Sequence, residues 1–173
     1  EFNIEGYPSD KCIDLVLSVK PGQVTLVPDP PGTLTSNEGW EIVPNMTFLQ
    51  GIIKKFQKAG IRTSIFIETD LENMRAARDT GTNRVELYTE PYASRYHDHP
   101  DEAIEPFVKA AEVAQEVGLG INAGHDLNLH NLRFFKQNIP GLLEVSIGHA
   151  LIADAIYFGL ETTIKKYLTE LKI

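Results

Sequence analysis

The sequence has few of the features that mark disulfide-stabilised or membrane-embedded proteins. Cys12 is the single cysteine among 173 residues, so no internal disulfide can form, and this usage is typical of a reducing compartment. No apolar stretch approaches the ~20 residues of a membrane span, and no basic segment precedes an apolar run as in a signal peptide. We therefore expect a cytoplasmic protein without a membrane partner.

Basic residues are also scarce. The chain has 16 Lys and Arg against 24 Asp and Glu, and the formal net charge of -8 argues against a nucleic-acid partner. A small phosphate ligand is still possible, because one local cluster of backbone N–H groups can bind it. With 42% apolar and 23% charged residues, the chain has the composition of one globular domain, which we place over residues 1–173.

Several catalytic motifs are missing as well. We find no Gly-x-Gly-x-x-Gly, Walker, Cys-x-x-Cys or nucleophile-elbow pattern, and no lysine at a strand end, which counts against a Schiff-base aldolase. His97-Asp98-His99 resembles a metal-ligand cluster, but the predicted polar loop over residues 92–101 offers it no rigid scaffold. We therefore assign the chain no metal site.

Six short segments rich in β-branched residues alternate with amphipathic segments. The predicted strands are Phe2–Gly6, Gln23–Pro28, Arg62–Glu68, Arg84–Thr89, Gly120–Gly124 and Glu144–Ile147. The predicted helices cover residues 9–19, 48–59, 71–77, 104–117, a short segment from 132, and a last segment over 156–171. Strict alternation of strand and helix predicts a parallel sheet.

This order is compatible with an open doubly wound sheet or with most of an eight-unit barrel. Five strand ends carry polar residues, namely Glu5, Asp29, Glu68, His125 and His149. Catalytic residues of a barrel come from the ends of many strands, whereas those of an open sheet gather at one crevice. We therefore favour an α/β fold of the (β/α)8 TIM-barrel type, with six units present in this chain.

Two of the predicted strands end in Gly-His, 24 residues apart, which suggests adjacent strands that share one pocket. Backbone N–H groups around Gly148 and His149, at a helix N-terminus, could hold a phosphate; the alternative is a tight turn without a ligand. His125 follows Gly124 and titrates near neutral pH, so it suits acid–base chemistry unless it is a structural histidine.

Two carboxylates, Glu5 and Glu86, lie within predicted strands. A charge inside a parallel sheet is poorly solvated, so it needs either a partner or a function. Burial in a barrel mouth would raise the pKa of such a group and suit it to proton transfer, whereas a structural ion pair is the alternative.

Several stretches of the sequence, taken in chain order, resemble the pyridoxine 5′-phosphate synthase family of vitamin B6 biosynthesis. The matching stretches are Phe2-Asn3-Ile4-Glu5, Leu26-Val27-Pro28, residues 34–39, residues 59–61, residues 64–67, residues 85–89, Asn122-Ala123-Gly124-His125, His130-Asn131 and Ile147-Gly148-His149-Ala150. The resemblance covers the whole chain. It implies an eight-unit barrel that assembles into a homo-octamer, in which this chain supplies strands three to eight.

The resemblance also implies an N-terminally truncated chain, in agreement with the abrupt start at Glu1-Phe2. Functional residues that the family carries after its first and second strands would then be absent. We expect such a chain to be inactive by itself.

The family condenses 1-deoxy-D-xylulose 5-phosphate with 3-amino-2-oxopropyl phosphate to pyridoxine 5′-phosphate, phosphate and water, without a metal or organic cofactor. The resemblance implies that Glu5 and His125 are general acid–base residues and that Glu86 stabilises the reacting system. It assigns substrate binding to Thr35, for the deoxyxylulose phosphate, and to Asp126, Gly148 and His149, for the amino ketone. Asp126 occupies a position that is often glycine in relatives.

Two further hypotheses remain open from the sequence. A different phosphosugar-binding barrel enzyme, such as an isomerase or epimerase, would share the site around Gly148, although Glu5, Glu86 and His125 together favour the synthase. An inactive fragment of the synthase that only associates with other chains is the third possibility.

Overall fold

All six strands form one parallel sheet in their sequence order. The computed structural model describes residues 1–30, 32–33 and 37–172. The strands are β1 (Asn3–Gly6), β2 (Gln23–Leu26), β3 (Arg62–Ile67), β4 (Arg84–Tyr88), β5 (Gly120–Gly124) and β6 (Leu142–Ser146). The spatial order β1-β2-β3-β4-β5-β6 has no reversal, which a doubly wound sheet would require. The chain is therefore wound in the manner of a barrel.

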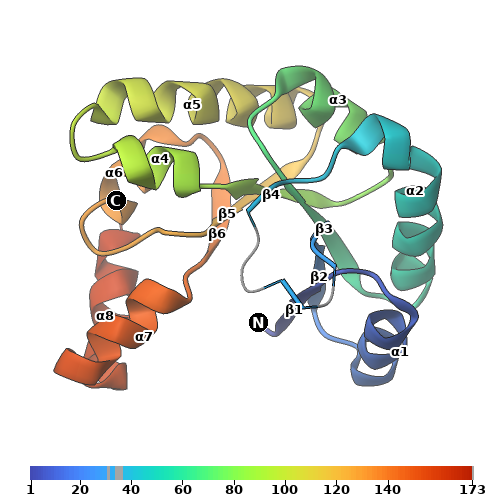
Figure 1. Ribbon diagram of the computed structural model, residues 1–173, viewed down its shortest axis with the longest axis horizontal. Helices are drawn as coiled ribbons and strands as arrows, with labels where there is room; N and C mark the ends of the chain where they lie inside the picture. Colours follow the sequence, from blue (N-terminus) through green and yellow to red (C-terminus); the bar gives the residue numbers. More distant parts are fainter. Residues whose placement is uncertain (31, 34–36, 173) are drawn as a thin grey trace.

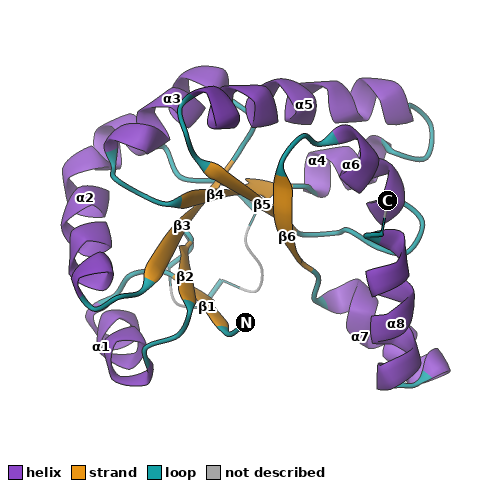
Figure 2. Cartoon of the chain, turned by 180° about the vertical axis from the view of Figure 1, so that it is seen from behind, coloured by secondary structure: helices purple, strands orange, loops and turns teal. Residues whose placement is uncertain are grey.

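The sheet curls into a half-barrel with helices on its convex side (Figure 1). The helices are α1 (Asp10–Val19), α2 (Ile42–Lys58), α3 (Leu71–Asp79), α4 (Glu90–Arg95), α5 (Pro100–Glu116), α6 (Leu132–Asn138), α7 (His149–Phe158) and α8 (Leu160–Glu170). Figure 2 shows the arc of helices open between α1 and the α7–α8 pair. In the part of the chain that the structure describes, β1 and β6 are edge strands that do not pair with each other.

Local sequence signals set several helix boundaries. Ser9 precedes α1 and its side chain accepts a hydrogen bond from the backbone N–H of Cys12 at 3.3 Å. Asp70 precedes α3 and accepts from the N–H of Asn73 at 2.7 Å. Gly60 follows α2 with φ +79°, the left-handed conformation that glycine adopts readily at helix ends. These three predicted boundaries are confirmed.

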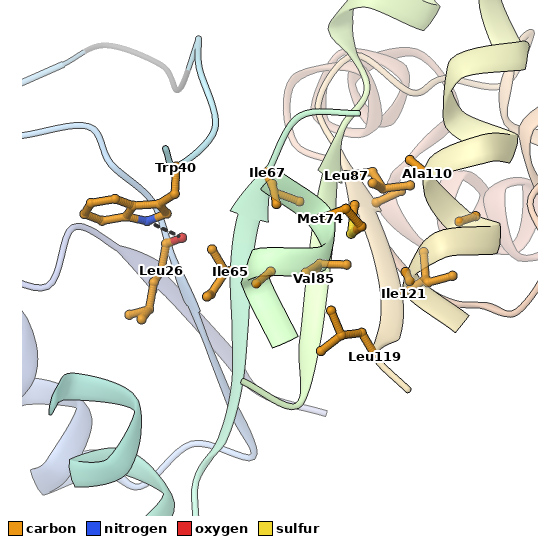
Figure 3. Close-up of a cluster of buried hydrophobic side chains, with 14 of the residues drawn as sticks. Leu26, Trp40, Ile65, Ile67, Met74, Val85, Leu87, Ala110, Leu119 and Ile121 are labelled. Atoms are coloured by element: carbon orange, nitrogen blue, oxygen red, sulfur yellow. Dashed lines mark hydrogen bonds between the residues drawn. The ribbon is translucent and has the colours of Figure 1, made fainter. Parts of the chain in front are cut away.

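The main core lies between the convex face of the sheet and the helices (Figure 3). Alternate strand residues such as Ile65, Val85 and Ile121 point outward and pack beneath helix residues such as Met74. Each such side chain is almost completely buried, and burial of an aliphatic side chain of this size stabilises the fold by about 1.5–3 kcal/mol. The remaining side chains of each strand, which alternate with these, therefore point to the opposite, concave face.

The concave face is unusually polar for a barrel interior, which is commonly filled by branched apolar residues. Near the amino ends of the strands, Glu144 forms ion pairs with Arg84 at 2.7 Å and Arg62 at 3.3 Å. The side-chain amides of Gln23 and Asn122 donate hydrogen bonds to the same carboxylate at 3.5 and 3.3 Å. This ionic layer joins β6 to the four preceding strands.

Two helix predictions were wrong. The segment predicted as a polar loop over residues 92–101 overlaps α4 and the start of α5. α4 begins with Glu90 and has Pro91 in its first turn, a position that suits proline. The predicted last helix is two helices, because Gly159 has φ +76° and ends α7. His130 lies in the exposed turn before α6.

The apolar stripe predicted for the last helix is not packed. Ile156 is 79% exposed, Leu160 56% and Leu168 52%, and α7 contains no buried residue. Because α7 and α8 follow the edge strand β6, few other elements face them. Among the described residues, no helix combines the length and apolar character needed to cross a membrane.

Candidate active site

The predicted site residues meet at the carboxyl ends of the strands. Glu5 lies on β1, Glu86 on β4, and His125 directly follows β5, while Gly148 and His149 follow β6. In a parallel barrel-type sheet these ends form one face, where the connecting loops build the active site. The structure therefore brings together five of the seven residues of the predicted site, and a sixth, Asp126, lies beside them.

Two adjoining cavities occupy this face and share two of the predicted acid–base residues. The first, of about 570 Å³, is lined by Glu5, His125, Lys11, Asp29 and Thr33 among others. The second, of about 420 Å³, is lined by Glu5, His125, Asp126, Ser146, Gly148 and His149 among others. Glu5 and His125 thus stand at the boundary between two spaces, each large enough for a small phosphorylated molecule.

Glu86 is a fully buried carboxylate with one unsatisfied oxygen. Thr25 donates a hydrogen bond from its hydroxyl to Oε2 at 3.1 Å, and Oε1 has no partner among the described residues. Burial, aided by the negative charges of Glu5 and Glu144 and partly offset by hydrogen bonding, raises the pKa of Glu86 to about 7. Glu86 can therefore hold or release a proton near neutral pH.

The carboxylate of Glu86 also explains why glycine occupies position 124. A Cβ atom at Gly124 would collide with Oε1 of Glu86 and would lie 3.2 Å from Cβ of Ser146. The φ of Gly124 is not in the left-handed region, so the backbone conformation does not require glycine here. The close approach of Glu86 does. The absence of a side chain at position 124 therefore leaves space for the carboxylate of Glu86.

Glu5 is exposed, contrary to the expectation that a strand carboxylate would be buried. β1 is an edge strand, so no further strand covers this side chain. Partial desolvation nevertheless raises the pKa of Glu5, and the charge of Asp29 raises it further. The proximity of two carboxylates favours the protonated form of Glu5 and suits it to proton donation.

The backbone at His125 and Asp126 is unusual. Both residues have positive φ, +82° and +59°, although neither is glycine. The hydroxyl of Thr89 donates to the carbonyl of Gly124 at 2.7 Å and also contacts the carbonyl of His125, while the backbone N–H of Thr89 donates to Gly124 at 2.9 Å. These contacts from the end of β4 hold the strained turn in place.

Asp126 is exposed and lines the second cavity. Its φ of +59° explains why glycine suits this position in relatives, and aspartate is among the few other residues that tolerate it. The Asp126 carbonyl accepts a hydrogen bond from the side-chain amide of Asn131 at 3.2 Å. The replacement therefore keeps the backbone of the turn and adds a negative charge to the cavity.

The predicted phosphate site lies at the start of α7. Gly148 precedes the helix without a side-chain cap, so the first N–H groups of α7 remain available to a ligand. Gly148 and His149 are both exposed, and a Cβ atom at Gly148 would meet no atom within 4 Å. The site is open and accessible from the second cavity.

Thr35, the remaining predicted binding residue, lies outside the described residues. Its neighbour Thr33 lines the first cavity. Sequence reasoning missed Thr25, Phe66 and Tyr88, which lie on the concave face with Glu86. Strand alternation was the signal that could have found them, since residues two apart on a strand share a face.

Comparison with solved structures supports the class of fold. The chain aligns with the crystal structure of the Amycolatopsis orientalis BexX/CysO complex with a TM-score of 0.59 and 13% identity, covering 99% of this chain and 67% of that one. At this identity the similarity concerns the fold alone. Fold and site together define an α/β half-barrel with a cluster of titratable residues at the carboxyl ends of its strands.

Sequence comparison shows the family. The family model of the pyridoxal phosphate biosynthesis protein PdxJ matches residues 1–172, and the chain belongs to this family. The pyridoxine 5′-phosphate synthase of Parabacteroides distasonis is 62% identical over 167 residues, 96% of this chain and 70% of the relative. That of Flavobacterium johnsoniae is 58% identical over 172 residues, 99% of this chain and 73% of the relative.

Proposed function

We propose that the protein acts as a pyridoxine 5′-phosphate synthase. The reaction joins 1-deoxy-D-xylulose 5-phosphate to 3-amino-2-oxopropyl phosphate and yields pyridoxine 5′-phosphate, phosphate and water. The observation that carries this proposal is the pair of adjoining cavities with Glu5 and His125 in the wall of both. A condensation needs two substrates side by side, with proton donors and acceptors between them.

The second cavity is suited to the amino ketone. Its phosphate would lie against the backbone of Gly148 and His149 at the α7 N-terminus, where N–H groups favour an anion. The ketone and amine would then extend toward Glu5 and His125. The first cavity is left for the deoxyxylulose phosphate, with Thr35 assigned to it by family resemblance.

Acid–base chemistry accounts for the reaction without a metal or organic cofactor. Imine formation, loss of phosphate, water addition, ring closure and dehydration all depend on proton transfers. Glu5 and Glu86 have raised pKa values and His125 has a lowered pKa, so the pKa values of the carboxyl groups and the imidazole are brought closer together, which favours proton exchange among them. We assign general acid–base roles to Glu5 and His125, and stabilisation of the developing charge to Glu86.

The six strands would be strands three to eight of an eight-unit barrel, within one incomplete domain over residues 1–173. The open sheet edges at β1 and β6 support this assignment, because two further strands between them would close the curl. We also propose that the protein assembles into a homo-octamer, as the family resemblance implies.

A direct assay tests the function. Purified intact protein is incubated with both phosphorylated substrates, and pyridoxine 5′-phosphate and inorganic phosphate are quantified. We expect both products in equal amounts, only when both substrates are present. Isomerisation of a phosphosugar without the amino ketone would instead favour the isomerase or epimerase hypothesis.

The matched variants are His125→Ala and His130→Ala. Loss of a general acid–base residue lowers rates by ~10²–10⁴, and we expect this of His125→Ala. His130 is exposed in the next turn and serves as the control, with unchanged turnover expected. Near-normal turnover of a folded His125→Ala protein would contradict the assignment of His125.

A further inference from the structure

A small apolar cluster lies apart from the main core, on the otherwise polar concave face. It consists of Val27, Phe66 and Tyr88, from the carboxyl ends of β2, β3 and β4. Phe66 is completely buried and packs against Tyr88 with 5.3 Å between ring centroids. No helix residue belongs to this cluster, so its aromatic rings pack against something other than the main core.

That neighbour is the imidazole of His125. Its ring centroid lies 4.7 Å from that of Phe66, with 54° between the planes, and 5.5 Å from that of Tyr88 in an edge-on arrangement at 77°. Aromatic rings at these separations and tilts attract each other in addition to burying apolar surface. Two contacts in different directions restrict both the position and the tilt of the imidazole.

The imidazole also has a buried nitrogen that is not hydrogen-bonded. Nδ1 of His125 is inaccessible to solvent and has no partner among the described residues. Buried polar atoms are rarely left unpaired, and exceptions often occur where a group is prepared for chemistry. Since Nδ1 is closed off, proton exchange with either cavity falls to Nε2.

We propose that Phe66 and Tyr88 are positioning residues that bracket the His125 ring, exclude water from Nδ1 and leave Nε2 as the atom that exchanges protons with the substrate. This inference deepens the proposed function and rests on it. Neither aromatic side chain takes part in proton transfer here. Both act by fixing the orientation of the imidazole and by keeping water away from it.

The charges around His125 determine what loss of a ring would do. Burial lowers the pKa of His125, and it outweighs the opposing effects of Asp126, of the Gly124 backbone and of Asp29, while His149 also lowers the pKa. Glu5 adds a further carboxyl group in the wall of both cavities. If water enters in place of a ring, the carboxylates remain and the burial effect weakens. The pKa of His125 must then rise.

Phe66→Leu tests the bracket, because leucine keeps the apolar volume but removes the ring. NMR titration of the His125 imidazole should show its pKa raised by about one unit relative to the parent. Turnover near neutral pH should fall roughly tenfold, since an aromatic contact and the ring orientation are lost, and the acid limb of the kcat/KM profile should move upward with the pKa.

Two further variants serve as controls. Phe135→Leu makes the same substitution at a fully buried phenylalanine of the main core, and the pKa of His125 should not change. Tyr88→Phe keeps the ring and should preserve the pKa of His125, whereas Tyr88→Leu should raise it. Tyr88→Leu also replaces Phe66→Leu if the latter fails to fold, since Tyr88 retains 9% exposure.

An unchanged His125 pKa and pH profile in folded Phe66→Leu or Tyr88→Leu would overturn the proposal. A shift of equal size in Phe135→Leu would do the same, because the effect would then be a general loosening of the fold. If the intact protein of the direct assay makes no pyridoxine 5′-phosphate while Phe66→Leu still raises the pKa of His125, the bracket is supported and the proposed function fails.

Discussion

At the scale of single residues, the turn after β5 combines chemistry with backbone strain. His125 and Asp126 both have positive φ, a conformation that costs an ordinary side chain about 1–2 kcal/mol. Hydrogen bonds from Thr89 and Asn131 hold this turn. This conformational cost occurs at the position where the side chain of His125 faces both cavities.

Asp126→Gly should be tolerated and should strengthen phosphate binding. Glycine adopts the φ of +59° freely, so the free energy of unfolding should stay within about 1 kcal/mol of the parent value or rise. Removal of a carboxylate from the second cavity should increase the affinity for phosphate. Phosphate titration and thermal unfolding measure both effects. Asp126→Ala removes the same charge but keeps the strain, so tighter phosphate with lower stability is expected. Unchanged phosphate affinity in both variants would place the anion elsewhere.

Glu86 predicts a specific dependence of stability on pH. Its folded pKa of about 7 exceeds the unfolded value of 4.5, so the folded state binds its proton more tightly, and stability falls as pH rises from 4.5 to 7. Glu86→Gln removes this loss. The variant should therefore be more stable than the parent above pH 7, by up to roughly 3 kcal/mol, and similar to it below pH 4.5.

Urea unfolding at a series of pH values measures this difference. Glu116→Gln, at an exposed position on α5, should show no such pH-dependent gain. A Glu86→Gln curve parallel to that of the parent at all pH values would show that Glu86 titrates normally.

At the scale of elements, the strands were predictable because their β-branched residues lie between clear turn signals. β5 was predicted with its observed bounds, and the other strand predictions overlap the observed ones with errors of one or two residues. The errors arose where a single local residue outweighs the apolar periodicity. α4 depends on Pro91 in its first turn, and the break at Gly159 interrupts a stripe whose apolar spacing continues through it.

The site was predictable to the extent that motif residues carry it. Glu5, Glu86, His125 and Gly148 lie at the face where the sequence placed them, although their roles stay predictions. Thr25, Phe66 and Tyr88 were missed, because each reads as an ordinary strand residue until strand register places it beside Glu86 or His125. Exposure of Glu5 was also missed, since it depends on which strand forms the edge.

The α7 N-terminus gives a prediction at this scale. Gly148→Val places a branched side chain in the open space before the helix, where the phosphate would lie, and phosphate affinity should fall at least tenfold. Isothermal titration with inorganic phosphate measures it. Gly51→Val, at an exposed α2 position where a Cβ atom would also meet nothing within 4 Å, is the matched control. Equal phosphate affinity in the two variants would contradict a phosphate site at the start of α7.

At the scale of the whole molecule, the curl of the sheet is incomplete. Within residues 1–30, 32–33 and 37–172, the outer edges of β1 and β6 are unpaired, and Ile156, Leu160 and Leu168 expose apolar surface on α7 and α8, which follow β6. Unpaired edges and apolar patches of this kind favour association.

We therefore predict that the 173-residue chain by itself self-associates and gives no synthase turnover. Sedimentation velocity over a range of concentrations should show species larger than 19.3 kDa. Ile156→Lys with Leu168→Lys should shift the distribution toward the monomer if the α7–α8 surface is responsible. A monomer at all concentrations, or turnover typical of a complete enzyme, would contradict this prediction.

The wall shared by the two cavities has a thermodynamic consequence. A phosphate dianion bound near His149 changes the free energy of protonating Glu5 and His125, and these groups also face the first cavity. Occupancy of one cavity must therefore alter affinity in the other by a factor that varies with pH, and linkage requires the same factor in both directions. The two ligands are then energetically coupled through protons, without any movement of the backbone.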